Sequence, residues 1–169
     1  MKKIMFNDKY GLTQAVLEGR KTMTRRIITD YYSAYRCGEV LAIAQSYASI
    51  HQELMNGHYA DSKYDAYRCA SVANTKGWKN KMFVRADLMP YHIQITDIKI
   101  ERLQDITGDD IAKEGVWLNE KIDRYMVGDK GFFLAKEAFE YLIDKVSKKG
   151  TWQINPYVFV YSFELIEYK

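Results

Sequence analysis

The sequence contains no run of about 18 apolar residues, the length that a helix needs to cross a bilayer. Two lysines follow Met1, but the apolar stretch after them is too short for a signal peptide. The two cysteines, Cys37 and Cys69, have no framework spacing, which suits a reducing compartment. We therefore expect a cytoplasmic protein that does not associate with a membrane.

The usual motifs for cofactors and metals are also missing. No GxGxxG follows a predicted strand, and there is no Walker A loop. The three histidines and two cysteines are too scattered for a zinc site. His51-Gln52-Glu53 has the H-x-E form of zinc deaminases, but the P-C-x-x-C partner is absent. We expect neither a metal nor an organic cofactor.

The net charge of +3 is small for a dedicated duplex-binding domain, which usually carries a stronger basic stripe. The distribution of charge is more informative. Lys21, Arg25 and Arg26 fall within six residues, whereas acidic residues concentrate over 105–114. The basic segment is therefore the first candidate for an anionic ligand.

Hydrophobic periodicity and turn residues predict an α+β chain forming one domain over 1–169. In the strand over 91–103, Ile98 and Ile100 are out of phase with Ile93 and Ile95, so we predict a bulge that returns them to the core. The polar, tyrosine-rich stretch 47–80 is predicted to be an insertion with one or two short helices. Helices are expected over 9–18 with Asp8 as cap, from Thr107 to Gly115, and over 133–148. Strands are expected over 39–47, 81–86, 91–103 and 157–166. The last of these strands is apolar on both faces, which predicts a central place in its sheet.

The segment from Gly19 to Arg26 has two interpretations. It is either a solvated basic turn after a helix end, or a site in which arginine forks hold phosphate. A desolvated Lys21 could also act as a base toward a Thr24 nucleophile. In a regular strand Lys21 and Thr24 point to opposite faces, so a shared pocket requires a turn or bulge between them.

This segment resembles the opening motif of ASCH domains, which belong to the PUA-like superfamily. Further resemblance follows in chain order at Gly38-Glu39-Val40-Leu41, over 95–107, at Ala112-Lys113-Glu114-Gly115 and over 155–164. Gly150-Thr151-Trp152 before Asn155-Pro156 is most similar to phage and prophage ASCH proteins. The resemblance implies a PUA-like mixed β-barrel with flanking helices, and RNA or a modified nucleotide as the partner.

One bacterial branch of that family hydrolyses acetylated cytidine. Its Lys-Thr-Glu set corresponds to Lys21, Thr24 and Glu114, and the resemblance implies that Thr24 attacks the amide carbonyl. Lys21 would take the threonine proton, and Glu114 would position Lys21 or relay the proton. The expected nucleic-acid contacts come from the rest of the motif: Arg20, Thr22, Arg25 and Arg26.

Three functions are therefore open. A module that binds RNA or a nucleotide is favoured, a deacylating amidohydrolase is the alternative, and a structural protein with a degenerate site is the third. Tyrosines interleaved with lysines and Arg68 in the 47–80 insertion suit unstacked bases, although they could equally pack the insertion itself. The oligomeric state cannot be read from the sequence.

Overall fold

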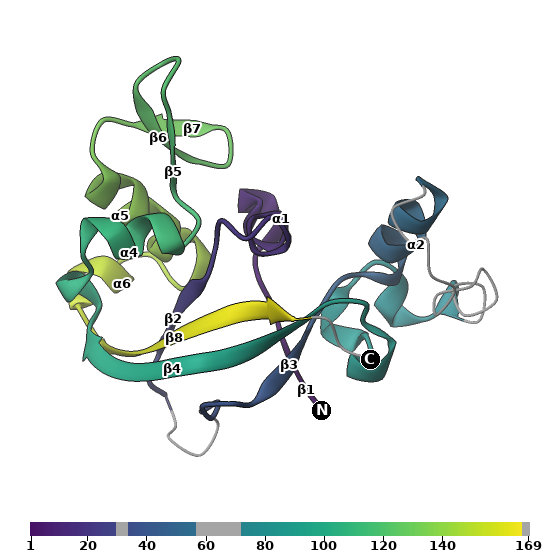
Figure 1. The fold of residues 1–169 in the computed structure, drawn as a ribbon. Coiled ribbons are helices and arrows are strands. Elements are labelled where there is room, and N and C mark those ends of the chain that lie inside the picture. Colours follow the sequence, from purple (N-terminus) through teal and green to yellow (C-terminus); the bar gives the residue numbers. More distant parts are fainter. Residues whose placement is uncertain (30–33, 57–71, 167–169) are drawn as a thin grey trace. The chain divides into compact units, whose positions relative to one another are not determined.

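The computed structural model describes residues 1–29, 34–56 and 72–166 (Figure 1). The chain forms two compact units, of which unit 1 comprises Met1–Phe6, Val40–Ile93 and the chain from Ile166. Unit 2 comprises Asn7–Glu39 and Gln94–Leu165. The single domain expected over 1–169 stays a prediction.

Unit 1 is built on two parallel strands, β1 (Lys2–Ile4) and β3 (Val40–Ile43). The helix α2 (Tyr47–Met55) begins after Ser46, whose hydroxyl accepts a hydrogen bond from the Ser49 backbone N–H. The core of this unit joins the end of β3 to α2 and to the turns before β4: Ala42, Ala44, Tyr47, Ile50, Val84 and Met89. Within the expected insertion, residues 57–71 lie outside the described part of the chain, and with them Cys69 and several of the tyrosines.

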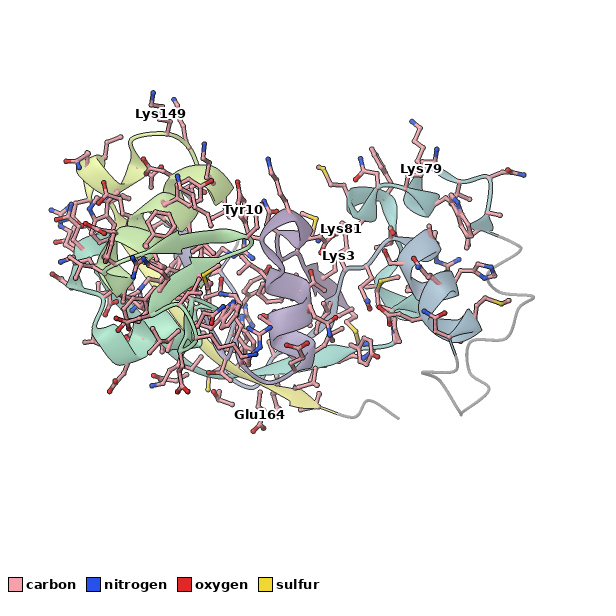
Figure 2. All side chains as sticks on the ribbon, turned by 90° about the horizontal axis from the view of Figure 1, so that it is seen from above. Lys3, Tyr10, Lys79, Lys81, Lys149 and Glu164 are labelled. Carbon is pink, nitrogen blue, oxygen red and sulfur yellow. The ribbon has the colours of Figure 1, made fainter. Side chains whose placement is uncertain are left out.

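The expected strand over 81–86 is wrong. The chain instead makes short 3-10 turns at Lys76–Trp78 (η2), Lys81–Phe83 (η3) and Ala86–Leu88 (η4). The Lys3 amine donates to the carbonyl oxygens of Met82 and Val84, at 2.6 and 2.8 Å, and the Lys81 amine donates to that of Phe6 (side chains in Figure 2). Lysine amines therefore take carbonyl groups that a strand would use for pairing.

Unit 2 is organised by β8 (Tyr157–Ile166), which lies between β4 (His92–Arg102) and β2 (Met23–Ile27). β2 and β8 are antiparallel, with Thr24 opposite Tyr161 and Arg25 opposite Val160. Side chains on both faces of β8 are buried, so the prediction of a central final strand is confirmed.

The helices expected from Thr107 to Gly115 and over 133–148 are present, the first helix is shifted, and a short helix over 151–154 was not predicted. A 3-10 turn, η1 (Asp8–Tyr10), is capped by Asn7, and Gly11 at φ 67° separates it from α1 (Leu12–Leu17). The expected Asp8-capped helix over 9–18 therefore begins later, because Gly11 interrupts it. The remaining helices are α4 (Gly108–Lys113), α5 (Ala135–Val146) and α6 (Thr151–Ile154), with the turn η5 (Leu103–Asp105) before α4.

A second, three-stranded antiparallel sheet was not predicted. It consists of β5 (Trp117–Asn119), β6 (Arg124–Val127) and β7 (Lys130–Phe132) in that order. Strands of three or four residues are too short to show a period of two in the sequence.

The α+β class is confirmed by this mixture of sheets and helices. Closure of the strands into a PUA-like barrel stays a prediction. None of the described helices combines the length and the apolar character required to span a membrane.

Candidate functional site

Lys21 is positioned by the short connection between α1 and β2. Gly19, at φ 72°, ends the helix by adopting the left-handed conformation that glycine tolerates best. The Lys21 backbone N–H then donates to Ala15 O, and that of Thr22 donates to Lys113 O, at 2.9 and 3.0 Å. These two bonds connect the basic segment to the end of α1 and to the end of α4.

Two carboxylates of the site project from one side of α4. Thr107, where the helix was expected to begin, caps it by accepting a hydrogen bond from the Asp110 backbone N–H. Asp110 and Glu114 are four residues apart, which places them on the same helical face. The helix ends at Glu114, and Gly115 leaves it at φ 99°, so the predicted end of this helix at Gly115 is also confirmed.

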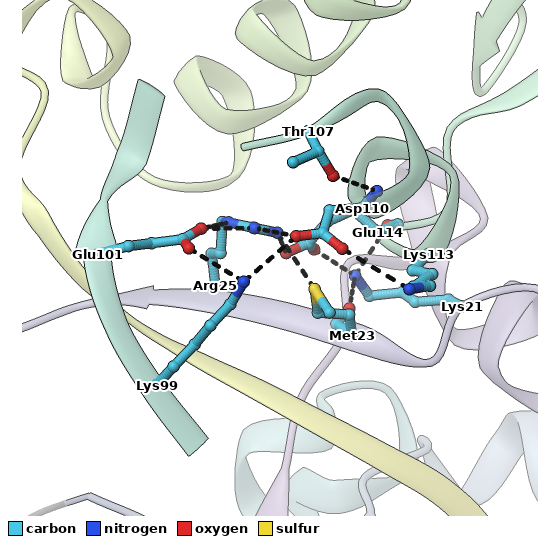
Figure 3. Close-up of polar contacts among 9 residues, drawn as sticks. All are labelled: Lys21, Met23, Arg25, Lys99, Glu101, Thr107, Asp110, Lys113 and Glu114. Carbon is cyan, nitrogen blue, oxygen red and sulfur yellow. Dashed lines mark hydrogen bonds and ion pairs between the residues drawn. The ribbon is translucent and has the colours of Figure 1, made fainter. Parts of the chain in front are cut away.

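Lys21 and Glu114 form a buried ion pair (Figure 3). The Lys21 amine lies 2.7 Å from Glu114 Oε2 and 2.8 Å from both the Glu114 and Met23 carbonyl oxygens. Three acceptors match the three N–H donors of an ammonium group. Burial lowers the pKa of Lys21, against the opposing attraction of the Glu114 carboxylate.

Arg25 is the centre of the cluster, and its side chain has no exposed surface. Its guanidinium contacts Glu101 Oε1 at 2.6 Å, Asp110 Oδ2 at 2.9 Å and Glu114 Oε1 at 3.2 Å. Glu114 thus binds Lys21 through one oxygen and Arg25 through the other. Burial alone would lower the pKa of Arg25 and raise that of Asp110, but their ion pairing reverses both effects: the pKa of Arg25 is raised and that of Asp110 is lowered.

Two exposed lysines border this buried network. The Lys99 amine lies 3.1 Å from Glu101 Oε2 and 3.5 Å from Asp110 Oδ2, and the Lys113 amine lies 3.7 Å from Asp110 Oδ1. Four cations therefore meet three carboxylates, which leaves the cluster with one net positive charge. The excess charge is accessible to solvent because the Lys99 and Lys113 side chains are about half exposed, 47% and 51%.

Thr24 is separate from this network. Successive residues of a strand point to opposite faces, so Thr24 lies on the face of β2 that carries Arg26, and Arg25 lies on the other. Thr24 is buried, and no described residue forms a hydrogen bond with its hydroxyl. The structure therefore brings Lys21 and Glu114 together and does not join Thr24 to them.

The four expected nucleic-acid contacts also separate. Arg25 is buried within the cluster, whereas Arg20 and Arg26 are exposed and Thr22 is half-buried. The Arg20 guanidinium pairs with the exposed carboxylate of Glu18. Among the described residues, no group of three or more His, Cys, Asp or Glu side chains is arranged to hold a metal ion.

Sequence reasoning missed Glu101, Asp110, Lys99 and Lys113 as members of the site. One available signal was the four-residue spacing of Asp110 and Glu114, and another was the two-residue spacing of Lys99 and Glu101 on one strand face.

Ile100, expected to return to the core, is instead 51% exposed. The face of β4 that carries Ile93 and Ile95 continues into Lys99 and Glu101, so the apolar face becomes the polar site.

No protein-family model matches this chain, and no curated protein sequence matches it. Among solved structures, an ASCH domain of Lactobacillus crispatus is 13% identical, with a TM-score of 0.49, covering 96% of this chain and 77% of that one. A DUF984 protein of Enterococcus faecalis is 14% identical, with a TM-score of 0.47, covering 99% of this chain and 81% of the other. At this level of similarity neither structure assigns a family or a ligand to this chain.

Proposed function

We propose that this chain is an ASCH-type domain that binds RNA or a nucleotide beside the buried cluster of Lys21, Arg25 and Glu114. The observation that carries the proposal is the Lys21–Glu114 ion pair at 2.7 Å. The two residues belong to two of the sequence segments that resemble ASCH domains, the opening motif and the later Ala112-Lys113-Glu114-Gly115 block. Their direct contact is what a shared site requires.

The buried charges act mainly by positioning other groups. Arg25 has its guanidinium occupied by three carboxylates, so it holds β2, β4 and α4 in place rather than reaching a ligand. Phosphate contacts beside the cluster come from the exposed cations Lys99 and Lys113, whereas the exposed Arg26 lies on the opposite face of β2. A phosphate beside Lys99 and Lys113 would neutralise the cluster's excess positive charge.

The alternative function is an amidohydrolase of acetylated cytidine-type nucleosides, with Thr24 as nucleophile, Lys21 as base and Glu114 positioning Lys21. The short Lys21–Glu114 contact favours this role for Glu114. However, Lys21 donates to three oxygens, and an ammonium group cannot accept the threonine proton until it has lost one of its own. Binding is therefore the function that this geometry supports better.

The binding proposal is tested with a fluorescently labelled single-stranded RNA of about 12 nucleotides. Fluorescence anisotropy gives the affinity at several salt concentrations, because displaced phosphate contacts make affinity fall with salt. The variant Lys99→Gln/Lys113→Gln should bind more weakly, with a slope of log affinity against log salt shallower by about 0.7 for each lost contact.

The matched control is Lys148→Gln/Lys149→Gln, which removes two exposed lysines after α5. Equal weakening in both double variants would show that binding depends only on net charge, and would contradict the proposed site. Absence of RNA and nucleotide binding in the native protein would reject the proposal outright.

The hydrolase alternative is tested by following acetylcytidine by chromatography in the presence of native protein, Lys21→Ala and Thr24→Ala. Turnover by the native protein that disappears in both variants would establish the hydrolase. Turnover that persists in Thr24→Ala would exclude Thr24 as the nucleophile.

A further inference from the structure

A pocket of about 300 Å³ lies on the face of the β2–β8 pair opposite to the Arg25–Glu114 cluster. Its lining comes from β2 and the segment after it, from the segment before β3, and from β8: Arg26, Ile27, Thr29, Ala34, Tyr35, Phe159 and Tyr161. Its volume is at the lower end of the range for small-molecule sites, so it suits one ring system rather than a large ligand.

The wall of the pocket is aromatic. Phe159 and Tyr161 are two residues apart on β8 and face the same side, with ring centroids 5.7 Å apart and planes inclined at 33°. The Tyr35 ring lies 5.1 Å from that of Tyr161, at 61°. Phe159 and Tyr161 are buried, whereas Tyr35 is half-buried, so the Tyr35 ring offers the larger exposed surface on which a planar ring can stack.

The pocket also provides specific polar groups. The Tyr161 hydroxyl accepts from the Tyr35 backbone N–H at 3.3 Å, and no other described residue hydrogen-bonds it, so its own proton is available to a ligand. A tyrosine hydroxyl is protonated at neutral pH, and burial raises the pKa of Tyr161 further. Arg26 lies directly across from Phe159 in the strand pairing, and its exposed guanidinium adds a positive charge beside the rings.

We propose that this pocket, lined by Phe159 and Tyr161, binds the base of a nucleotide stacked on the Tyr35 ring, with the attached phosphate beside Arg26. This inference rests on the proposed nucleotide-binding function and adds that the base of the nucleotide lies in this pocket. Thr24 is opposite Tyr161 on the same face, so the bound base lies on the Thr24 side of β2. Lys21 and Glu114 then act from the other side, by positioning the strand.

Isothermal titration with cytidine, cytidine 5′-monophosphate and ribose 5-phosphate separates recognition of the base from recognition of the phosphate. The monophosphate should bind most tightly, cytidine more weakly, and ribose 5-phosphate least. Tyr35→Leu should weaken cytidine binding about tenfold or more, whereas Tyr35→Phe, which keeps the ring, should preserve it. Arg26→Gln should weaken the monophosphate but not cytidine, and the control Arg124→Gln, on β6, should weaken neither.

The inference would be overturned if ribose 5-phosphate bound as tightly as the monophosphate. It would also be overturned if Tyr35→Leu bound cytidine as tightly as the native protein does. A cytidine hexamer that binds more tightly than the monophosphate would identify single-stranded RNA as the source of the base, and equal affinities would identify a free nucleotide. Cytidine is uncharged, so its binding is independent of the Lys99 and Lys113 contacts. Salt-dependent RNA binding without cytidine binding therefore rejects this pocket alone, and the reverse rejects the proposed phosphate contacts alone.

Discussion

Glu114 shares its carboxylate between Lys21 and Arg25, with Oε2 2.7 Å from the Lys21 amine and Oε1 3.2 Å from the Arg25 guanidinium. One buried acidic group therefore compensates two buried cations. The cost of desolvating these charges is offset only while both contacts persist. Stability and site geometry thus depend on the same residue.

Glu114→Gln should lower the free energy of unfolding by roughly 3–5 kcal/mol, because it leaves two buried cations with less compensation. Urea unfolding at pH 7 measures this loss, and Glu120→Gln, at an exposed position, should change stability by less than about 0.5 kcal/mol. The double variant Lys21→Met/Glu114→Gln should recover part of the loss. A loss below about 1 kcal/mol for Glu114→Gln would mean that the ion pair is not required for folding.

The stability of the protein should fall in acid partly through Asp110. The pKa of Asp110 is lower in the folded protein than its ordinary value of 3.8, so its ion pairs contribute fully above that pH. The contribution is lost as the pH falls through the folded pKa. Asp110→Asn should therefore show a smaller drop in unfolding free energy between pH 7 and pH 3 than the native protein does. Asp109→Asn, exposed on the same helix, is the control, and an equal change in both variants would contradict the assignment.

Gly115→Ala should destabilise the protein more than Gly19→Ala. Both glycines have positive φ, at 99° and 72°, so both substitutions carry backbone strain. A Cβ at Gly115 would also lie 3.1 Å from Leu12 Cδ2 and 3.5 Å from Lys21 Cδ, whereas none of the neighbouring atoms comes within 4 Å of a Cβ at Gly19. The difference in thermal unfolding between the two variants measures the crowding of a Cβ at position 115 against Leu12, and no difference would argue against tight packing there.

Thr24→Val should change the free energy of unfolding by less than about 1.5 kcal/mol, because the hydroxyl forms no hydrogen bond with a described residue and the shape is retained. RNA affinity should also be unchanged, because Thr24 is not a proposed phosphate contact. Any acetylcytidine hydrolysis by the native protein should disappear in this variant if Thr24 is the nucleophile. A large loss of stability would show instead that the Thr24 hydroxyl forms a hydrogen bond that the fold requires.

Local signals in the sequence predicted the limits of α4 well, although they placed the start of the first helix too early. The capping hydroxyl of Thr107, the stop at Gly115 and the apolar stripe of α5 depend on residues within one or two turns of each other. The final strand was predicted at 157–166, which are its observed limits, because its two apolar faces are visible without knowledge of the rest of the fold. The turns over 81–86 escaped prediction because distant Lys3 takes their carbonyl groups.

In the candidate site, too, features set by neighbouring residues could be predicted from the sequence, whereas features set by distant residues could not. The sequence by itself determined that Lys21 follows a glycine-terminated helix and that Glu114 ends another, since these are properties of neighbouring residues. Only the tertiary structure decided that Arg25 is buried among Glu101, Asp110 and Glu114, at separations of 76 to 89 residues. An arginine in a basic run has the same local sequence whether it faces solvent or three carboxylates. Its environment is set by the pairing of β2 with β8, which brings Glu101 of β4 within reach, and by the packing of β2 against α4; no local pattern encodes either.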